Sequence, residues 1–175
     1  MSDTVMTKFR LFGAWQDEKE EAWLRNMSQA GWHFQSIDFP GFYRFVAGEP
    51  RDYVYRLDFN TDRKGYQQYL QLFRDAGWEH LTVYGSWQYF RILAQPGENP
   101  DIYTDNSSKI SKYQRILTLL VVLNPIYIII LSRFSNSESL FQFIVFVLVL
   151  VIEIIFIYAI IRLIQRIRHL QKIKE

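Results

Sequence analysis

The stretch LFQFIVFVLVLVIEIIFIYAII, residues 140–161, decides the fold of the second half of this chain. It runs for twenty-two residues with a single charge, Glu153. At 1.5 Å per residue a helix of this length spans about 33 Å, enough for a hydrocarbon core of about 30 Å. A helix on the surface of a soluble domain has a polar face, and this run has none. We therefore predict a membrane-spanning helix over 140–161.

A second apolar run comes shortly before it. Residues 116–131 read ILTLLVVLNPIYIIIL, sixteen residues without a charge. As a helix this run is about 24 Å long, so it needs its flanking residues or a locally thinner bilayer to cross. The connection 132–139 is too short to span any distance, which makes the two helices antiparallel neighbours. We predict a transmembrane hairpin of helices 116–132 and 140–161.

Basic residues lie beside the two predicted helices and give their orientation. Short loops rich in Lys and Arg stay in the cytoplasm, and only Arg133 lies in the connection between the helices. We therefore predict a two-pass protein of the cell membrane with both termini cytoplasmic, a polar and basic linker over 95–115 and a basic tail over 162–175. The flanking basic residues are Lys109, Lys112, Arg115, Arg162, Arg166, Arg168, Lys172 and Lys174.

Two polar features interrupt the apolar runs at similar depth, Asn124-Pro125 in the first and Glu153 in the second. A carboxyl group at that depth is costly unless it is paired. We expect protonated Glu153 to donate a hydrogen bond to the Asn124 carbonyl, or to the backbone carbonyl that Pro125 frees. The alternative is a path for ions or protons, as in a small transporter or channel subunit.

Residues 1–105 have a different composition. They carry 11 Lys and Arg against 15 Asp and Glu, a net charge of −4, and the remainder carries 9 against 3, a net charge of +6. An acidic domain repels phosphate, so nucleic acid is not an expected partner. The chain has no cysteine, which excludes disulfides, thiolate metal sites and thiol nucleophiles.

An internal repeat organises this first part. Ala30-Gly31-Trp32 recurs 46 residues later as Ala76-Gly77-Trp78, and the same separation maps Arg10-Leu11 onto Arg56-Leu57. Alternating strand patterns and amphipathic helix patterns surround each copy. Two copies are too few for a repeat array, which favours one domain with internal duplication.

Each copy, about 8–47 and 53–94, is predicted as a β-α-β-β unit whose first strand covers Lys8–Ala14 or Tyr53–Phe59. Such alternation predicts an α+β domain, with a largely antiparallel, ferredoxin-like sheet that carries both helices on one face. The sequence thus divides into a cytoplasmic α+β domain over 1–105 and the helical hairpin.

Aromatic residues are concentrated in the first domain, which holds 22 of the 30 Phe, Tyr and Trp residues. Those at strand ends and hairpins form a candidate binding surface. Packing in the core or in turns is the alternative for each of them. The candidates are Trp15, Phe42, Tyr43, Trp87 and Tyr89.

A search for catalytic patterns gives no candidate. His33, His80 and His169 lack the spacing of metal ligands. The acidic residues at 17–21 are read as complementing the dipole at a helix start. We therefore predict no metal, no cofactor and no enzymatic activity.

Three segments together resemble a bacterial family known as a domain of unknown function, DUF2812. They are KFRLFGAWQDEKEEAWLRNMSQAGWHF (8–34), YVYRLDF (53–59) and LFRDAGWEHLTVYGSWQYFR (72–91). The resemblance implies a soluble domain followed by membrane helices, genes often placed beside PadR-type repressors, and a regulatory or sensing role. It supplies no catalytic residues.

The functional prediction is a non-enzymatic, membrane-tethered regulatory or sensing module whose cytoplasmic domain binds a protein or a small ligand. Its expected partners are the lipid bilayer, a protein of a regulatory system and a second copy of the chain through the membrane helices. The alternative remains a small transporter or channel subunit that uses Glu153 and Asn124.

Overall fold

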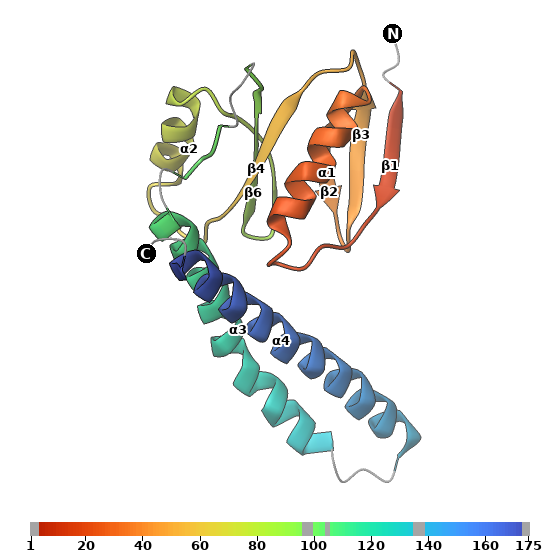
Figure 1. The fold of residues 1–175 in the computed structure, drawn as a ribbon. Helices are drawn as coiled ribbons and strands as arrows, with labels where there is room; N and C mark the ends of the chain where they lie inside the picture. Colours follow the sequence, from red (N-terminus) through yellow and green to blue (C-terminus); the bar gives the residue numbers. More distant parts are fainter. Residues whose placement is uncertain (1–3, 96–99, 104–105, 135–138, 173–175) are drawn as a thin grey trace. The chain divides into compact units, whose positions relative to one another are not determined.

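A computed structural model describes residues 4–95, 100–103, 106–134 and 139–172. The chain divides into two compact units, Met1–Thr104 and Asp105–Glu175 (Figure 1). Predicted features at 135–138 and at Lys174 lie outside the described residues.

The first unit contains two successive β-α-β-β units. The first comprises β1 (Val5–Phe9), α1 (Asp17–Gln29), β2 (Trp32–Asp38) and β3 (Phe42–Ala47). The second comprises β4 (Tyr53–Phe59), α2 (Tyr66–Asp75), β5 (Glu79–Tyr84) and β6 (Trp87–Leu93). The predicted α+β class and element order are therefore confirmed.

The strands form two three-stranded antiparallel sheets, β1-β3-β2 and β4-β6-β5, instead of one ferredoxin-like sheet. Strands β2 and β5 contact each other without forming a ladder. Each has a register shift, between Phe34 and Ser36 in β2 and between His80 and Thr82 in β5. A bulge bends its strand and disrupts regular pairing, which is consistent with two sheets where the sequence predicted one.

The spacing between the two copies of the repeat is not constant along the chain. The two register shifts lie 46 residues apart, as predicted, but the first strands do not follow that spacing. Phe9 pairs with Phe42 at the turn end of β3, and Phe59 pairs with Trp87 at the turn end of β6. The equivalent positions Phe9 and Phe59 are thus 50 residues apart, so the mapping of Arg10-Leu11 onto Arg56-Leu57 was wrong.

The change in offset arises around the helices. Helix α1 has 13 residues and α2 has 10, and the segment before α2 is one residue shorter than that before α1. The first strand also differs from the prediction, because it covers Val5–Phe9 and not 8–14. Residues 13–16 form a turn in which Gln16 donates its backbone N–H to Gly13, and the Gly13 N–H donates to the Gln16 side chain.

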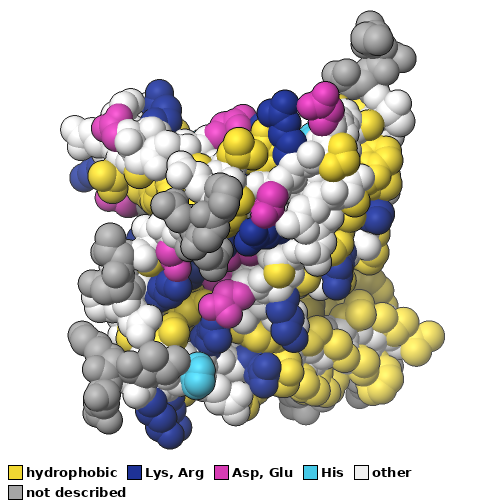
Figure 2. Space-filling view, turned by 45° about the horizontal axis from the view of Figure 1, so that its top comes forward, with side chains coloured by type: hydrophobic (Ala, Val, Ile, Leu, Met, Phe, Trp, Pro, Cys, Tyr) yellow, Lys and Arg dark blue, Asp and Glu magenta, His cyan; other side chains and the backbone are white. Residues whose placement is uncertain are grey.

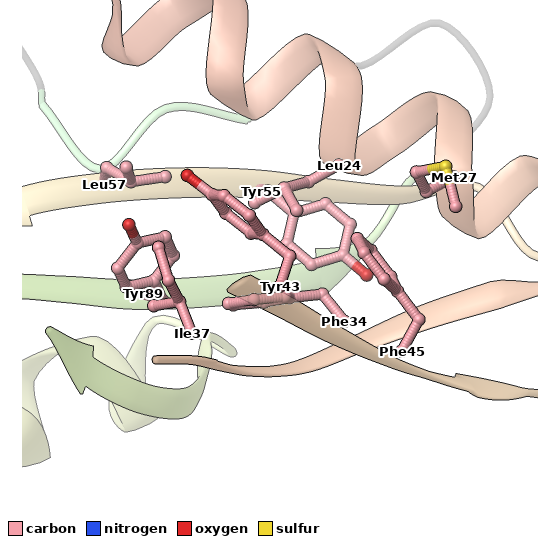
Figure 3. Close-up of a cluster of buried hydrophobic side chains, with 9 residues drawn as sticks. All are labelled: Leu24, Met27, Phe34, Ile37, Tyr43, Phe45, Tyr55, Leu57 and Tyr89. Atoms are coloured by element: carbon pink, nitrogen blue, oxygen red, sulfur yellow. The ribbon is translucent and has the colours of Figure 1, made fainter. Parts of the chain in front are cut away.

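Helix α1 connects the two sheets, since it packs against β2 of the first sheet and β4 of the second. Helix α2 packs against β5. The core under α1 is rich in aromatic rings (Figure 3). It comprises Leu24, Met27, Phe34, Ile37, Tyr43, Phe45, Tyr55, Leu57 and Tyr89. On the face that Figure 2 shows, basic and acidic side chains are interspersed.

The second unit consists of α3 (Asn106–Phe134) and α4 (Leu140–Lys172), which pack against each other. Both are long and apolar enough to cross a membrane. They extend beyond the apolar runs, because α3 begins inside the predicted linker 95–115 and α4 includes most of the predicted tail 162–175. Lys, Arg, Gln and Leu at these ends are good helix formers, so the helices continue where the hydrophobic signal stops.

Candidate functional site

A cavity of about 80 Å³ lies in the first unit, where the two β-α-β-β units meet. Its wall includes Asp17 and Glu20 from α1, Tyr43 from β3, and Trp87 and Tyr89 from β6. Residues of the segment before α1 and of the β2–β3 turn complete the lining. Both halves of the repeat therefore contribute to it.

The carboxyl group of Glu20 is the centre of this site. Its residue is only 6% exposed, and its Oε1 accepts hydrogen bonds from the hydroxyls of Tyr43 and Tyr89, each at 2.7 Å. In Figure 3 both hydroxyls lie at the same end of the aromatic cluster. Within the part of the chain that the structure describes, no side chain donates to Oε2 of Glu20.

The electrostatics of the cavity favour the protonated tyrosines as donors. Burial raises the pKa of Glu20, the hydrogen bonds from Tyr43 and Tyr89 oppose that rise, and the charge of Asp17 adds to it. Burial and the neighbouring Glu20 raise the pKa values of both tyrosines. Glu20 is therefore the group of this trio that changes charge at the lowest pH.

The structure separates the five predicted aromatic residues. Tyr43, Trp87 and Tyr89 line the cavity, with Tyr43 and Tyr89 buried, so they do not form an open surface. Phe42 is exposed and its ring lies 5.1 Å from that of Phe9. Trp15 is half-buried and is not among the residues of the cavity wall.

Sequence reasoning missed Glu20, because acidic residues at a helix start were attributed to dipole complementation. A signal was present in the helix period. Glu20 lies four residues before Leu24, and Leu24 lies three before Met27, which places all three on the buried face of α1. A carboxyl group on the buried stripe of a helix requires partners, and such a group is a candidate for a site.

The next residue, Glu21, fastens α1 to the second sheet. Its carboxylate accepts the Leu57 backbone N–H at 2.8 Å and a guanidinium N–H of Arg56 at 3.3 Å. Arg56 also pairs with Asp101 at 3.7 Å. Adjacent residues of one helix thus contact the cavity and, through Arg56, the segment that leads toward α3.

Asp58 holds the same segment on the first unit. It accepts hydrogen bonds from the hydroxyls of Tyr69 at 2.9 Å and of Tyr103 at 2.5 Å. Ile102 packs against the second apolar cluster, which includes Phe90. Residues 100–103 are therefore part of the folded unit and not a free linker.

A second, more open cavity of about 780 Å³ is lined by His33, His80 and Arg91 among others. His80 lies 3.0 Å from Gln88 Oε1, and burial lowers its pKa. Arg91 forms two hydrogen bonds with Glu79, at 2.7 and 3.0 Å. Within the described ranges there is no group of three or more His, Cys, Asp or Glu side chains placed to hold a metal ion.

Asn124 and Glu153 meet between α3 and α4, as the sequence predicted. The Asn124 amide Nδ2 donates to Glu153 Oε1 at 2.6 Å. We had expected the Glu153 carboxyl group to be the donor, whereas the structure has the amide as the donor. Glu153 is 7% exposed, and its buried Oε2 has no hydrogen-bond partner among the described residues. Pro125 lies inside α3, next to this pair.

The basic residues that flank the apolar runs lie on α3 and α4 up to Lys172. Two of them contact Tyr113. The Lys112 ammonium lies 5.1 Å from the centre of the Tyr113 ring, and Arg166 Nε donates to its hydroxyl at 3.5 Å.

These observations define a class: an α+β domain with an acidic and aromatic cavity, followed by two helices long and apolar enough to cross a membrane. Residues 16–124 match the model of the DUF2812 family, which is described as a protein of unknown function. The match covers more than half of the chain, and the chain belongs to this family. No curated protein and no solved structure matches it.

Proposed function

We propose that this chain is a non-enzymatic, membrane-tethered sensing module whose first unit binds a small ligand that carries a positively charged amine. The observation that carries the proposal is the Glu20 carboxyl group, which is buried at the wall of a cavity and accepts both tyrosine hydrogen bonds on one oxygen.

The charge of the ligand follows from the lining. Asp17 and Glu20 place two carboxyl groups beside aromatic rings, among them Trp87. Aromatic faces and carboxylates together stabilise an ammonium group. The guanidinium of Arg10, the one basic residue among the described lining residues, lies over the rings of Phe12 and Trp23 at 4.9 and 5.0 Å.

The size of the ligand follows from the volume. A buried water needs about 10–15 Å³ of free volume, so a cavity of about 80 Å³ accommodates only a few waters or one small organic ion. Pockets for drug-sized ligands usually measure about 300–1,000 Å³. A short alkylamine therefore fits better than a nucleotide or a peptide.

Two further features support a sensing role at a membrane. The two long apolar helices provide the tether, and the basic residues beside them favour cytoplasmic termini. Glu20 adjoins Glu21, which contacts Arg56 and through it Asp101. A ligand that moves Glu20 therefore acts on a helix that also holds the segment leading toward α3.

The test uses the full chain in detergent, with butylammonium, 1-butanol and butyrate as probes of similar size. Butylammonium should raise the unfolding temperature, and butanol and butyrate should not. Glu20→Gln should abolish the shift, whereas Glu18→Gln on the exposed side of the same helix start should keep it. A response to none of the three probes would refute the small-ligand function, and an equal response to all three would refute the charge argument.

The second candidate is a subunit of a small transporter or channel. The buried Oε2 of Glu153, which has no hydrogen-bond partner among the described residues, favours it. In proteoliposomes, proton or cation flux that disappears in Glu153→Gln, with the protein equally stable, would support this function. Flux at the level of empty liposomes for the unmodified chain would exclude it.

A further inference from the structure

Three exposed phenylalanines and one exposed leucine of the first unit gather at one end of its first sheet. Phe39 is 84% exposed, Leu11 64%, Phe9 56% and Phe42 42%. Phe9 is the last residue of β1, and Phe42 is the first of β3. We call these four residues the aromatic tip.

Local contacts hold the aromatic tip together. Phe9 pairs with Phe42 in the sheet, and their rings lie 5.1 Å apart. The Arg10 backbone N–H donates to the Gly41 carbonyl at 3.0 Å, which joins the end of β1 to the β2–β3 turn. Leu11 lies against the same glycine, because a Cβ added at Gly41 would be 3.0 Å from a Leu11 methyl. These contacts hold the end of β1 against the β2–β3 turn, which also carries Phe39.

Exposure of these apolar side chains to water is unfavourable, and their composition is that of an interfacial anchor. Soluble surfaces rarely keep several large apolar side chains together without a binding role. Arg44 lies two residues after Phe42 on the same open face of β3, where its side chain, 57% exposed, forms an ion pair with Asp38 at 2.9 Å. Exposed aromatic rings are typical of segments that enter the headgroup region of a bilayer.

We propose that the aromatic tip docks into the headgroup layer of a lipid bilayer, that of the membrane in which the chain's own helices reside. A convex turn with a nearly fully exposed Phe39 fits a deformable lipid surface better than a flat protein interface. Covalent attachment to membrane helices gives a high effective concentration of bilayer, so a weak intrinsic affinity suffices. The inference rests on the proposed membrane tether and does not require amine binding, although Leu11 also lines the cavity.

The chain has no cysteine, so single reporters can be introduced without removing native residues. Phe39→Cys and, as a second reporter, Leu11→Cys would carry an environment-sensitive fluorophore in the full chain, with one copy in each lipid nanodisc. Leu72→Cys is the matched control, because Leu72 is an exposed apolar residue of α2 at 67%.

Labels at Phe39 and Leu11 should emit at shorter wavelength in nanodiscs that contain anionic lipid and should be quenched by lipid-borne nitroxides, whereas the Leu72 label should not. Arg44→Glu should reduce the quenching. Water-like emission at both tip positions in single-copy nanodiscs would overturn the proposal, and so would protection that appears only with two copies, which would assign the tip to self-association. Release of the chain from membranes by alkaline carbonate would instead refute the tether itself.

Discussion

Tyr89→Phe tests the role of the buried carboxyl group most directly. The substitution removes one hydroxyl that lies 2.7 Å from Glu20 Oε1 and leaves the ring, which is buried in the core. A hydrogen bond to a charged group contributes about 1.5–3 kcal/mol. Because Tyr43 still donates to the same oxygen, we expect the lower part of that range, about 1.5–2 kcal/mol, for Tyr89→Phe at pH 8.

The double variant should cost more than the sum of the two single variants. Tyr43→Phe alone leaves Tyr89 as a donor, but both changes together leave a buried carboxylate without a hydroxyl donor. Removing the last partner of a buried charge exposes its full desolvation penalty. The double-mutant cycle should therefore show a coupling of about 1 kcal/mol or more.

The pH dependence has a definite sign. Burial raises the pKa of Glu20 in the folded state above its unfolded value near 4.5. The protonated carboxyl group therefore contributes its full stabilisation below pH 4.5, and this stabilisation is lost as the pH rises through the folded-state pKa. Asp17, Arg10, Tyr43, Tyr84 and Tyr89 are the titratable residues that line the cavity around it. As the pH rises from 4.5 through the folded-state pKa of Glu20, the free energy of unfolding of the unmodified chain should fall relative to that of Glu20→Gln. The cost of Tyr89→Phe should shrink toward acid pH, where the carboxyl group is neutral.

The assay is urea unfolding of the full chain in detergent, followed by tryptophan fluorescence. All five Trp residues lie before residue 105, so the signal reports the first unit alone. A cost for Tyr89→Phe that stays the same from pH 4 to pH 8, or no cost at any pH, would refute the argument that the hydroxyl stabilises a carboxylate.

Three other predictions follow from residues already placed. Glu153→Gln should leave the stability of the hairpin nearly unchanged, because an amide can still accept from Asn124, and Glu153→Leu should lose about 0.6–2 kcal/mol, measured by unfolding in mixed micelles; a larger loss for Gln than for Leu would contradict the pairing. Cysteines at Ser107 and at Ser137, which lies outside the described residues, should react oppositely with an impermeant reagent in intact cells, and labelling at Ser107 would exclude cytoplasmic termini. Leu24→Ala should destabilise the first unit by about 2–5 kcal/mol in urea, because the Leu24 side chain on α1 is fully buried in the core. A loss below about 1 kcal/mol would mean that the core is not packed as described.

Hydrophobic runs and repeated motifs predicted the large features well. The uncharged stretches located both long helices, and the two Ala-Gly-Trp motifs located both β-α-β-β units, because these signals depend on local sequence. The division into two sheets was not predictable in this way. Whether β2 and β5 pair is a long-range property, and the bulges in these strands, after Phe34 and His80, leave little trace in a pattern of alternating residues.

The cavity was only half visible in the sequence. The density of aromatic residues pointed to Tyr43, Trp87 and Tyr89. It did not show that they lie beside Glu20 of α1, which accepts a hydrogen bond from Tyr43. The contact between Glu20 and Tyr89 joins residues 69 positions apart, which no local pattern reveals. Asn124 and Glu153 were predictable because an antiparallel hairpin with a short connection relates depth to sequence position.

Helix α1 also constrains the timing of synthesis. Its Glu20 contacts Tyr89 on β6 and its Glu21 contacts Leu57 on β4, so α1 can make all of these contacts only after Tyr89 has left the ribosome. Helix α3 begins at Asn106, seventeen residues later, which at 5–20 residues per second is a delay of about one to three seconds. Completion of the first unit and synthesis of the first apolar helix therefore fall within the same short interval.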